Sequence, residues 1–162
     1  MQRIVRGART ERGGLVCREN VGGDMKIYTT SREDYLKAIY VLQRRNNEVR
    51  SVDVARYLGF SKPSVCHAVS LLTSEGFLQV DDAYGLHLTE SGLEIARKTY
   101  ERHCFFSNYL IELGVDRNTA MEDACRMEHA ISDESFEKLK EALGPKDGPV
   151  GRDYFPDEVI PK

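Results

Sequence analysis

Apolar positions recur with a helical period from Thr29 onwards, and the first such stretch predicts an amphipathic helix. Residues 29–31 carry hydroxyl groups that can cap a helix N-terminus, and the acidic Glu33 and Asp34 suit its first turn. An apolar stripe follows, made of Tyr35, Leu36, Ile39, Tyr40, Val41 and Leu42. We expect this helix to end near Asn46.

Two further helical stretches follow with almost no loop between them. The first begins at Ser51 and ends at Gly59, a residue type that readily adopts the left-handed conformation of a helix C-cap. The second has Ser61 as its N-cap and Pro63 in its first turn, and it ends at Gly76. Its apolar stripe comprises Val65, Val69, Leu71 and Leu72. Two helices joined by such a short turn are typical of a helix-turn-helix.

A strand period replaces the helical period after Gly76. Residues 77–80 and 86–88 are expected to be strands, with a turn over 81–85, so the pattern predicts a hairpin wing. Three more helices are then expected. They run from Thr89 to before Gly114, from Asp116 to about Ile131, and from Ser132 to Leu143.

These elements predict a mainly α protein. A winged helix-turn-helix occupies residues 29–90, a helical domain occupies 91–143, and 144–162 form an irregular tail with three prolines. Residues 1–28 have neither period and are expected to be a disordered extension. Since two glycine codons before Met25 can spell a ribosome-binding site, we hypothesise that translation starts at Met25 and that residues 1–24 are not part of the native protein. Mass spectrometry of the native protein tests this.

Composition indicates a globular protein, with 41% hydrophobic and 30% charged residues. No apolar run approaches the roughly 20 residues that span a bilayer, and there is no secretory signal, so we expect a cytoplasmic protein. The cysteines form no CxxC pair and no disulfide framework. The net charge of −3 argues against DNA binding only as a global average, because an acidic half of the chain can hide a basic face.

The motif that carries most chemistry is Cys125-Arg126-Met127-Glu128-His129. On a helix, Cys125 shares a face with residues three and four positions later, namely Glu128 and His129. Sulfur, oxygen and nitrogen donors together suit a transition metal, whereas Mg²⁺ and Ca²⁺ prefer oxygen alone. His103, on the preceding helix, could reach the same site. The alternative is that Cys125 is a core residue beside an exposed polar pair.

A second set of polar residues lies on the predicted recognition helix, opposite its apolar stripe. Small hydroxyls and basic groups at a helix N-terminus can contact phosphates and base edges in the major groove. The residues are Ser61, Lys62, Ser64 and His67. In the wing, Asp81 and Asp82 would repel phosphate, which leaves Tyr84 as the expected contact. The alternative is an ordinary solvated helix face.

Together these features resemble the family of metal-dependent repressors that includes the diphtheria toxin repressor and the manganese transport regulator. The similarity runs from about Thr30 to Leu143. It is most specific over 122–133, which resembles the iron-responsive branch, and it also covers the first helix (33–36, 39–40) and the recognition helix (61–65), where Pro63 joins the expected DNA-contacting residues.

The resemblance implies a homodimer that binds a palindromic operator when a divalent ion links the first helix to a metal-binding and dimerisation domain. It places the principal metal ligands at Asp34, Cys125, Glu128 and His129, with His103 as a further ligand. An ancillary site of the family does not match: its iron-type carboxylate would fall on Ser107, its imidazole on Met121, and a manganese-type carboxylate on Lys37. Asp34 matches the manganese branch and Cys125 the iron branch, and the soft sulfur leads us to expect Fe(II) rather than Mn(II).

Two other function classes stay open at this point. One is a small metalloenzyme that uses the same ligands, although no carboxylate and base stand in a recognisable catalytic spacing, so we expect no enzyme. The other is a winged-helix regulator of an organic ligand. Metal content of the purified protein distinguishes them.

Overall fold

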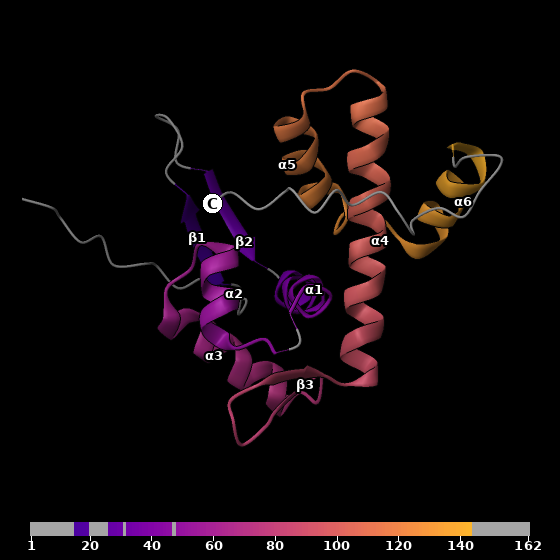
Figure 1. Cartoon of the computed structure of the whole chain (residues 1–162). Coiled ribbons are helices and arrows are strands. Elements are labelled where there is room, and N and C mark those ends of the chain that lie inside the picture. Colours follow the sequence, from indigo (N-terminus) through magenta and orange to yellow (C-terminus); the bar gives the residue numbers. More distant parts are fainter. Residues whose placement is uncertain (1–14, 20–25, 31, 47, 144–162) are drawn as a thin grey trace, which may run out of the picture. The chain divides into compact units, whose positions relative to one another are not determined.

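The computed structural model describes residues 15–19, 26–30, 32–46 and 48–143, with side chains from residue 32 onwards. The chain divides into two compact units, an N-terminal unit up to Ala96 and a C-terminal unit from Arg97 (Figure 1). The predicted tail over 144–162 and the proposed start at Met25 lie outside the described residues.

A hairpin precedes the first helix. Strand β1 (Leu15–Glu19) pairs antiparallel with β2 (Lys26–Thr30), with Leu15 opposite Thr30 and Glu19 opposite Lys26. The sequence pattern predicted no strand over residues 1–28, so the structure differs from that expectation at these positions. That the extension is not native stays a prediction.

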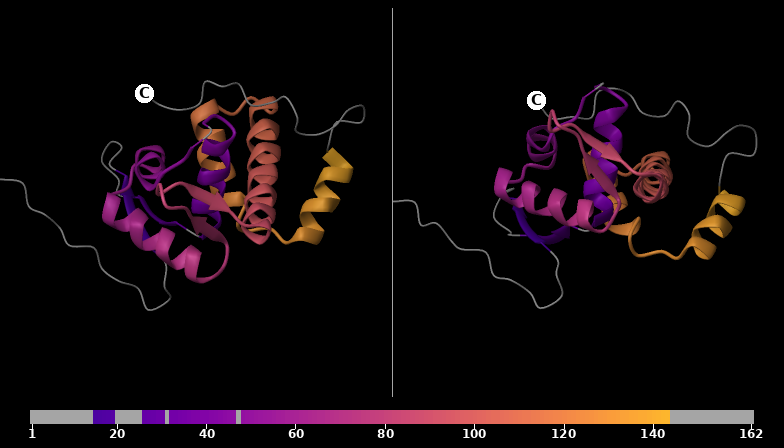
Figure 2. Two further views of the ribbon diagram at one scale, coloured as in Figure 1. Left: turned by 60° about the horizontal axis from the view of Figure 1, so that its bottom comes forward. Right: turned by 90° about the horizontal axis from the view of Figure 1, so that it is seen from below.

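Three helices form the body of the N-terminal unit. They are α1 (Arg32–Gln43), α2 (Ser51–Leu58) and α3 (Lys62–Ser74), and they pack against one another (Figures 1 and 2). Gly59 closes α2 with φ 70°, a conformation that costs a glycine little, and Phe60 N–H donates to the carbonyl of Ala55. Ser61 caps α3 by accepting from Ser64 N–H. The predicted helix-turn-helix is confirmed.

The wing follows α3 directly. Strands β3 (Leu78–Val80) and β4 (Leu86–Leu88) pair antiparallel, with Leu78 opposite Leu88. A 2.8 Å hydrogen bond from Leu86 N–H to the carbonyl of Val49 joins the wing to the connection between α1 and α2. The buried core of the unit draws on every helix and both wing strands, and its fully buried large side chains include Leu36, Ile39, Val54, Val65, Leu72, Leu78 and Leu86.

One predicted core position is wrong. Leu71 is 41% exposed, although the pattern had placed it on the apolar stripe of α3. The buried face of α3 consists instead of Val65, Ala68, Val69 and Leu72, whose spacing follows one side of a helix.

The remaining helices are α4 (Glu90–Glu112), α5 (Arg117–Met127) and α6 (Asp133–Leu143). In the C-terminal unit they share a second core, in which Phe105 and Phe106 of α4 meet Ala124 of α5 and Phe136 of α6. Phe136 contacts both phenylalanines, with ring centroids 5.4 and 6.0 Å apart. This aromatic cluster holds together α4, which carries His103, and α5, which carries Cys125. Among the described residues, no helix is long and apolar enough to cross a membrane.

Candidate metal centre and nucleic-acid interface

The end of α5 differs from the sequence prediction. The pattern predicted a helix to about Ile131, but α5 ends at Met127 with Glu128 as its C-cap. Glu128 N–H still donates to the carbonyl of Ala124 at 3.0 Å, so Glu128 keeps its place one turn after Cys125. His129 lies outside the helix. The spacing argument therefore holds for Glu128, while the turn after the helix positions His129.

Glu128 is the centre of the cluster. Its side chain is 0% exposed, and each carboxylate oxygen faces an imidazole. Oε2 lies 2.9 Å from Nδ1 of the buried His103 on α4, and Oε1 lies 3.2 Å from Nε2 of His129, whose side chain is 24% exposed. A carboxylate removed from water requires such partners, because a buried charge without them is very costly.

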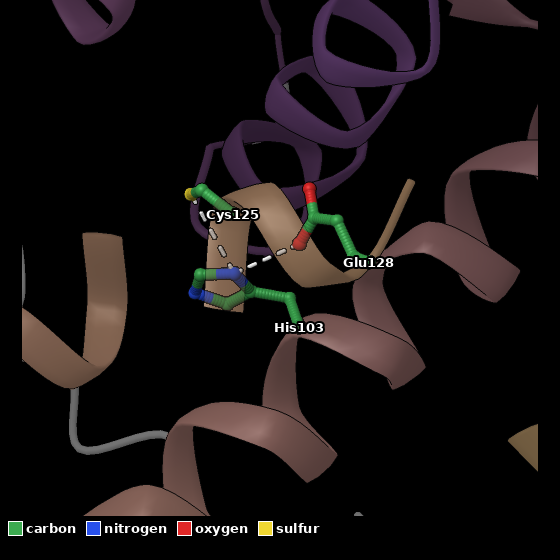
Figure 3. Close-up of side chains that lie close together, drawn as sticks. All are labelled: His103, Cys125 and Glu128. Carbon is green, nitrogen blue, oxygen red and sulfur yellow. Dashed lines mark hydrogen bonds and ion pairs between the residues drawn. The ribbon is translucent and has the colours of Figure 1, made fainter. Parts of the chain in front are cut away.

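Cys125 adds a sulfur donor to this pair. Its Sγ lies 3.7 Å from His103 Nδ1, and Figure 3 shows the thiol and the Glu128 carboxylate converging on the same imidazole. Donor atoms of His103, Cys125 and Glu128 all lie within 4.8 Å of one another. Thus the packing of α4 and α5 brings the nitrogen donor of His103 to the sulfur donor of Cys125, 22 positions later in the chain, and to the oxygen donor of Glu128, 25 positions later.

The chemistry of these donors fits a transition-metal ion. Thiolate and imidazole bind Fe, Zn, Co or Cu ions well and Mg²⁺ or Ca²⁺ poorly, and the carboxylate supplies a compensating negative charge. Cys125 is exposed whereas His103 and Glu128 are buried. The cluster is therefore accessible to solvent at the Cys125 thiol, while its carboxylate and imidazole lie in the interior.

The second candidate surface is the N-terminal half of α3. Lys62, Pro63 and His67 are exposed there. Ser61 and Ser64 share a 2.8 Å hydrogen bond between their hydroxyls, so these two groups hold the start of the helix as well as facing outward. Cys66, which the sequence reasoning passed over, is also exposed on this surface. Polar and cationic side chains thus gather where a recognition helix needs them.

The turn of the wing is organised by Asp81. Its Oδ1 accepts from the N–H groups of Ala83 and Gly85, both at 2.8 Å, and its Oδ2 lies 2.7 Å from His87 Nε2. The hydrogen bond with His87 and those from Gly85 and Ala83 hold the pKa of the Asp81 carboxyl below its ordinary value, against a smaller opposing effect of burial. Tyr84 has a positive φ of 63° and is 76% exposed. Asp81 therefore holds the turn in which Tyr84 stands exposed.

Comparison with known proteins identifies the family. A sequence model described as the iron dependent repressor N-terminal DNA binding domain matches residues 28–86, and one described as its metal binding and dimerisation domain matches 89–153. An uncharacterized HTH-type transcriptional regulator of Methanocaldococcus jannaschii is 38% identical over 112 residues, which cover 68% of this chain and 90% of that protein. The chain belongs to the iron dependent repressor family.

Other members of the family agree in sequence and in fold. The transcriptional regulator MntR of Escherichia coli O157:H7 is 35% identical over 126 residues, covering 75% of this chain and 81% of that protein. The structure of the manganese regulator SloR matches with a TM-score of 0.66 and 31% identity over 74% of this chain. The match covers 56% of the SloR chain, so this chain spans little more than half of that length. The predicted family and fold class are confirmed.

The structure describes two of the positions at which the resemblance places ancillary ligands that this chain lacks. Ser107, where an iron-type carboxylate would stand, is buried and donates its hydroxyl to the Cys104 carbonyl at 3.2 Å. Lys37 places an ammonium 3.6 Å from Asp34 Oδ1 on α1, with 12% and 20% of these side chains exposed. Asp34 lies in the N-terminal unit, and its part in a metal site stays a prediction.

Sequence reasoning missed Arg102. Its guanidinium contacts the backbone carbonyls of Glu128 and Ile131, on the connection from α5 to α6, and forms an ion pair with Asp133, the first residue of α6. Every residue has a backbone carbonyl, so no sequence pattern could have revealed the contacts with Glu128 and Ile131. The only available signal was that Arg102 directly precedes His103.

Proposed function

We propose that this chain is a divalent-metal-dependent, DNA-binding transcriptional repressor of metal homeostasis genes, which acts in the cytoplasm as a homodimer on a palindromic operator. The observation that carries the proposal is the fully buried Glu128 carboxylate, set between two imidazoles and close to the Cys125 thiol. Such a cluster, on the same chain as a winged helix-turn-helix, favours metal-controlled DNA binding over catalysis.

The proposed ligands are His103, Cys125, Glu128 and His129, with Asp34 of α1 added on the family resemblance. When bound, a divalent ion supplies a Lewis-acidic centre that replaces ligand protons and joins these donors. The protein residues have separate roles. Glu128 places a carboxylate in the interior, and His103 of α4 orients that carboxylate. Asp34 would make DNA binding sensitive to the occupancy of the site, since α1 belongs to the DNA-binding unit.

We propose Fe(II) rather than Mn(II) as the activating ion. The names of relatives support either metal, because the family model is that of an iron dependent repressor and SloR is a manganese regulator. The argument for iron is the Cys125 thiol, because soft sulfur ligands suit Fe(II) better than Mn(II). Replacing Cys125 by Ser should therefore weaken Fe(II) binding more than Mn(II) binding, and equal weakening would contradict the preference.

The proposed operator contacts are made by α3 and the wing. They comprise Ser61, Lys62, Pro63, Ser64, His67 and Tyr84. The exposed N-terminal half of α3 would enter the major groove, where Lys62 suits phosphate and His67 a base edge, and Tyr84 would contact the backbone from the wing. A homodimer presents two such surfaces, which matches the symmetry of a palindromic site.

Metal content and operator binding test the proposal together. Protein purified without chelator should contain a divalent transition metal that is lost on Glu128→Ala, whereas a sensor of an organic ligand would contain none that depends on Glu128. Replacing Lys62 and His67 together by Ala should abolish operator binding and leave metal binding intact. Unchanged operator affinity of this double variant at matched salt would contradict the recognition-helix assignment.

A further inference from the structure

The guanidinium of Arg102 makes three polar contacts beside the metal centre, although Arg102 is not a proposed ligand. It comes from α4, one residue before His103. Its Nη1 donates to the carbonyl of Glu128 at 3.2 Å and to the carbonyl of Ile131 at 3.1 Å, and its Nη2 pairs with Asp133. The Arg102 side chain is only 14% exposed.

These contacts fall where α5 stops. The last carbonyls of a helix have no intrahelical donor and favour a nearby cation, and here Glu128, the C-cap of α5, supplies one carbonyl while Ile131 supplies the other from the turn beyond it. Arg102 supplies both donor and cation to the turn that joins α5 to α6, and its guanidinium carbon lies 5.5 Å from the ring centre of Phe136, which packs over it. A planar fork of N–H groups can serve two carbonyls and a carboxylate at once, whereas a lysine ammonium cannot match that geometry.

Glu128 is consequently fixed at both ends by adjacent residues of α4. Arg102 holds its backbone carbonyl, and His103 holds its carboxylate, 2.9 Å from Nδ1. The same turn carries His129. Since the charge of Arg102 is balanced by Asp133, its effect on a nearby cation is mainly geometric.

We propose that Arg102 is the positioning residue of the metal centre. It fixes the turn after α5 so that the Glu128 carboxylate and the His129 imidazole are in place before an ion arrives. The proposal rests on the proposed metal-binding function, and it assigns to Arg102 an effect on metal affinity that exceeds its contribution to stability. Residues that orient metal ligands typically change affinity by about 10- to 100-fold when they are replaced.

The test compares Arg102→Met with Lys140→Met in the full chain after chelation, with Co(II) as the probe. Lys140 is a matched control because it also links α6 to α4, through a 2.7 Å ion pair with Glu101, and lies 5.2 Å from the centre of the Phe136 ring, but no described contact joins it to Glu128. Each variant is measured for Co(II) affinity, for the visible absorption spectrum of bound Co(II), and for stability to urea in chelator.

Arg102→Met should bind Co(II) about 10- to 100-fold more weakly, with an altered absorption spectrum, and Lys140→Met should keep wild-type affinity and spectrum even if it loses as much stability. Arg102→Lys should fall between Arg102→Met and wild type, and it replaces Arg102→Met if that variant does not fold. Wild-type affinity and spectrum in the Arg102 variant, or an equal loss in Lys140→Met, would overturn the proposal. If the wild-type chain binds no Co(II), the metal-binding function itself fails, and the proposal with it.

Discussion

Replacing His103, the imidazole partner of Glu128, should lower the stability of the metal-free protein. In the folded chain, the Glu128 side chain is 0% exposed and that of His103 is 8% exposed. Removing one partner of a buried pair costs about 3–5 kcal/mol, since the other charge stays buried without compensation. His129 still faces the second carboxylate oxygen at 3.2 Å, so we expect His103→Leu to cost about 2–4 kcal/mol.

Removing both partners should restore most of that stability. Replacing a buried ionic pair by apolar residues of similar volume is often neutral or stabilising. The double variant His103→Leu, Glu128→Met should therefore be within about 1 kcal/mol of wild type, and at least about 1 kcal/mol more stable than His103→Leu alone. Urea unfolding in the presence of chelator measures this as a shift of the midpoint at unchanged slope.

Two results would refute this reasoning. The first is a His103→Leu variant as stable as wild type in chelator, which would mean that Glu128 does not depend on this imidazole. The second is a double variant less stable than His103→Leu, which would mean that Glu128 stabilises the fold by itself. The expected result would instead show that the His103–Glu128 pair contributes little net stability to the metal-free fold.

Three other predictions concern the rest of the fold and the first helix. Gly92→Ala should destabilise the protein by about 1–3 kcal/mol in thermal unfolding, because a Cβ there would lie 2.0 Å from the Phe77 carbonyl oxygen. Gly76→Ala is the control for the cost of a positive φ, since its Cβ meets no atom within 4 Å, and equal losses of stability in the two variants would contradict the steric explanation. Asp81→Asn should lower the melting temperature at neutral pH, because the lowered pKa of Asp81 makes its stabilising contribution present above pH 3.8 and absent once the folded protein takes up the proton. The difference in melting temperature between variant and wild type should therefore close as the pH falls below 3.8, and a difference independent of pH would contradict this. Lys37→Met should raise metal affinity by about two- to fivefold in a chelator competition titration by releasing Asp34 from its ion pair, and an unchanged affinity would argue against Asp34 as a ligand.

Local signals predicted the helix-turn-helix because its boundaries depend on individual residues. Ser61 accepts from Ser64 N–H and Gly59 adopts a positive φ, and both effects follow from residue type alone. Leu71 was placed wrongly because apolar character does not decide which side of α3 faces the core. The β1–β2 hairpin was missed because its two short strands carry no clear alternation.

The metal cluster could be predicted only in part. Cys125 and Glu128 share a helix face, so their spacing indicated a site, and the structure confirms that they lie together. His103 joins them only through the packing of α4 against α5, which no local pattern encodes. The predicted end of α5 lay about four residues beyond the observed one, because the apolar period continues to Ile131. In the structure these residues form a connecting turn, and Arg102 donates to its carbonyls.

Operator affinity with and without metal tests the central claim most directly. The chain is stripped with chelator and titrated onto operator DNA at fixed salt, and then again after addition of Fe(II) or of Mn(II) under reducing, anaerobic conditions. A metal-dependent repressor should bind weakly when stripped and at least about tenfold more tightly when loaded, and Glu128→Ala should show no such gain. If the stripped protein binds operator as tightly as the loaded protein, metal does not control DNA binding in this chain.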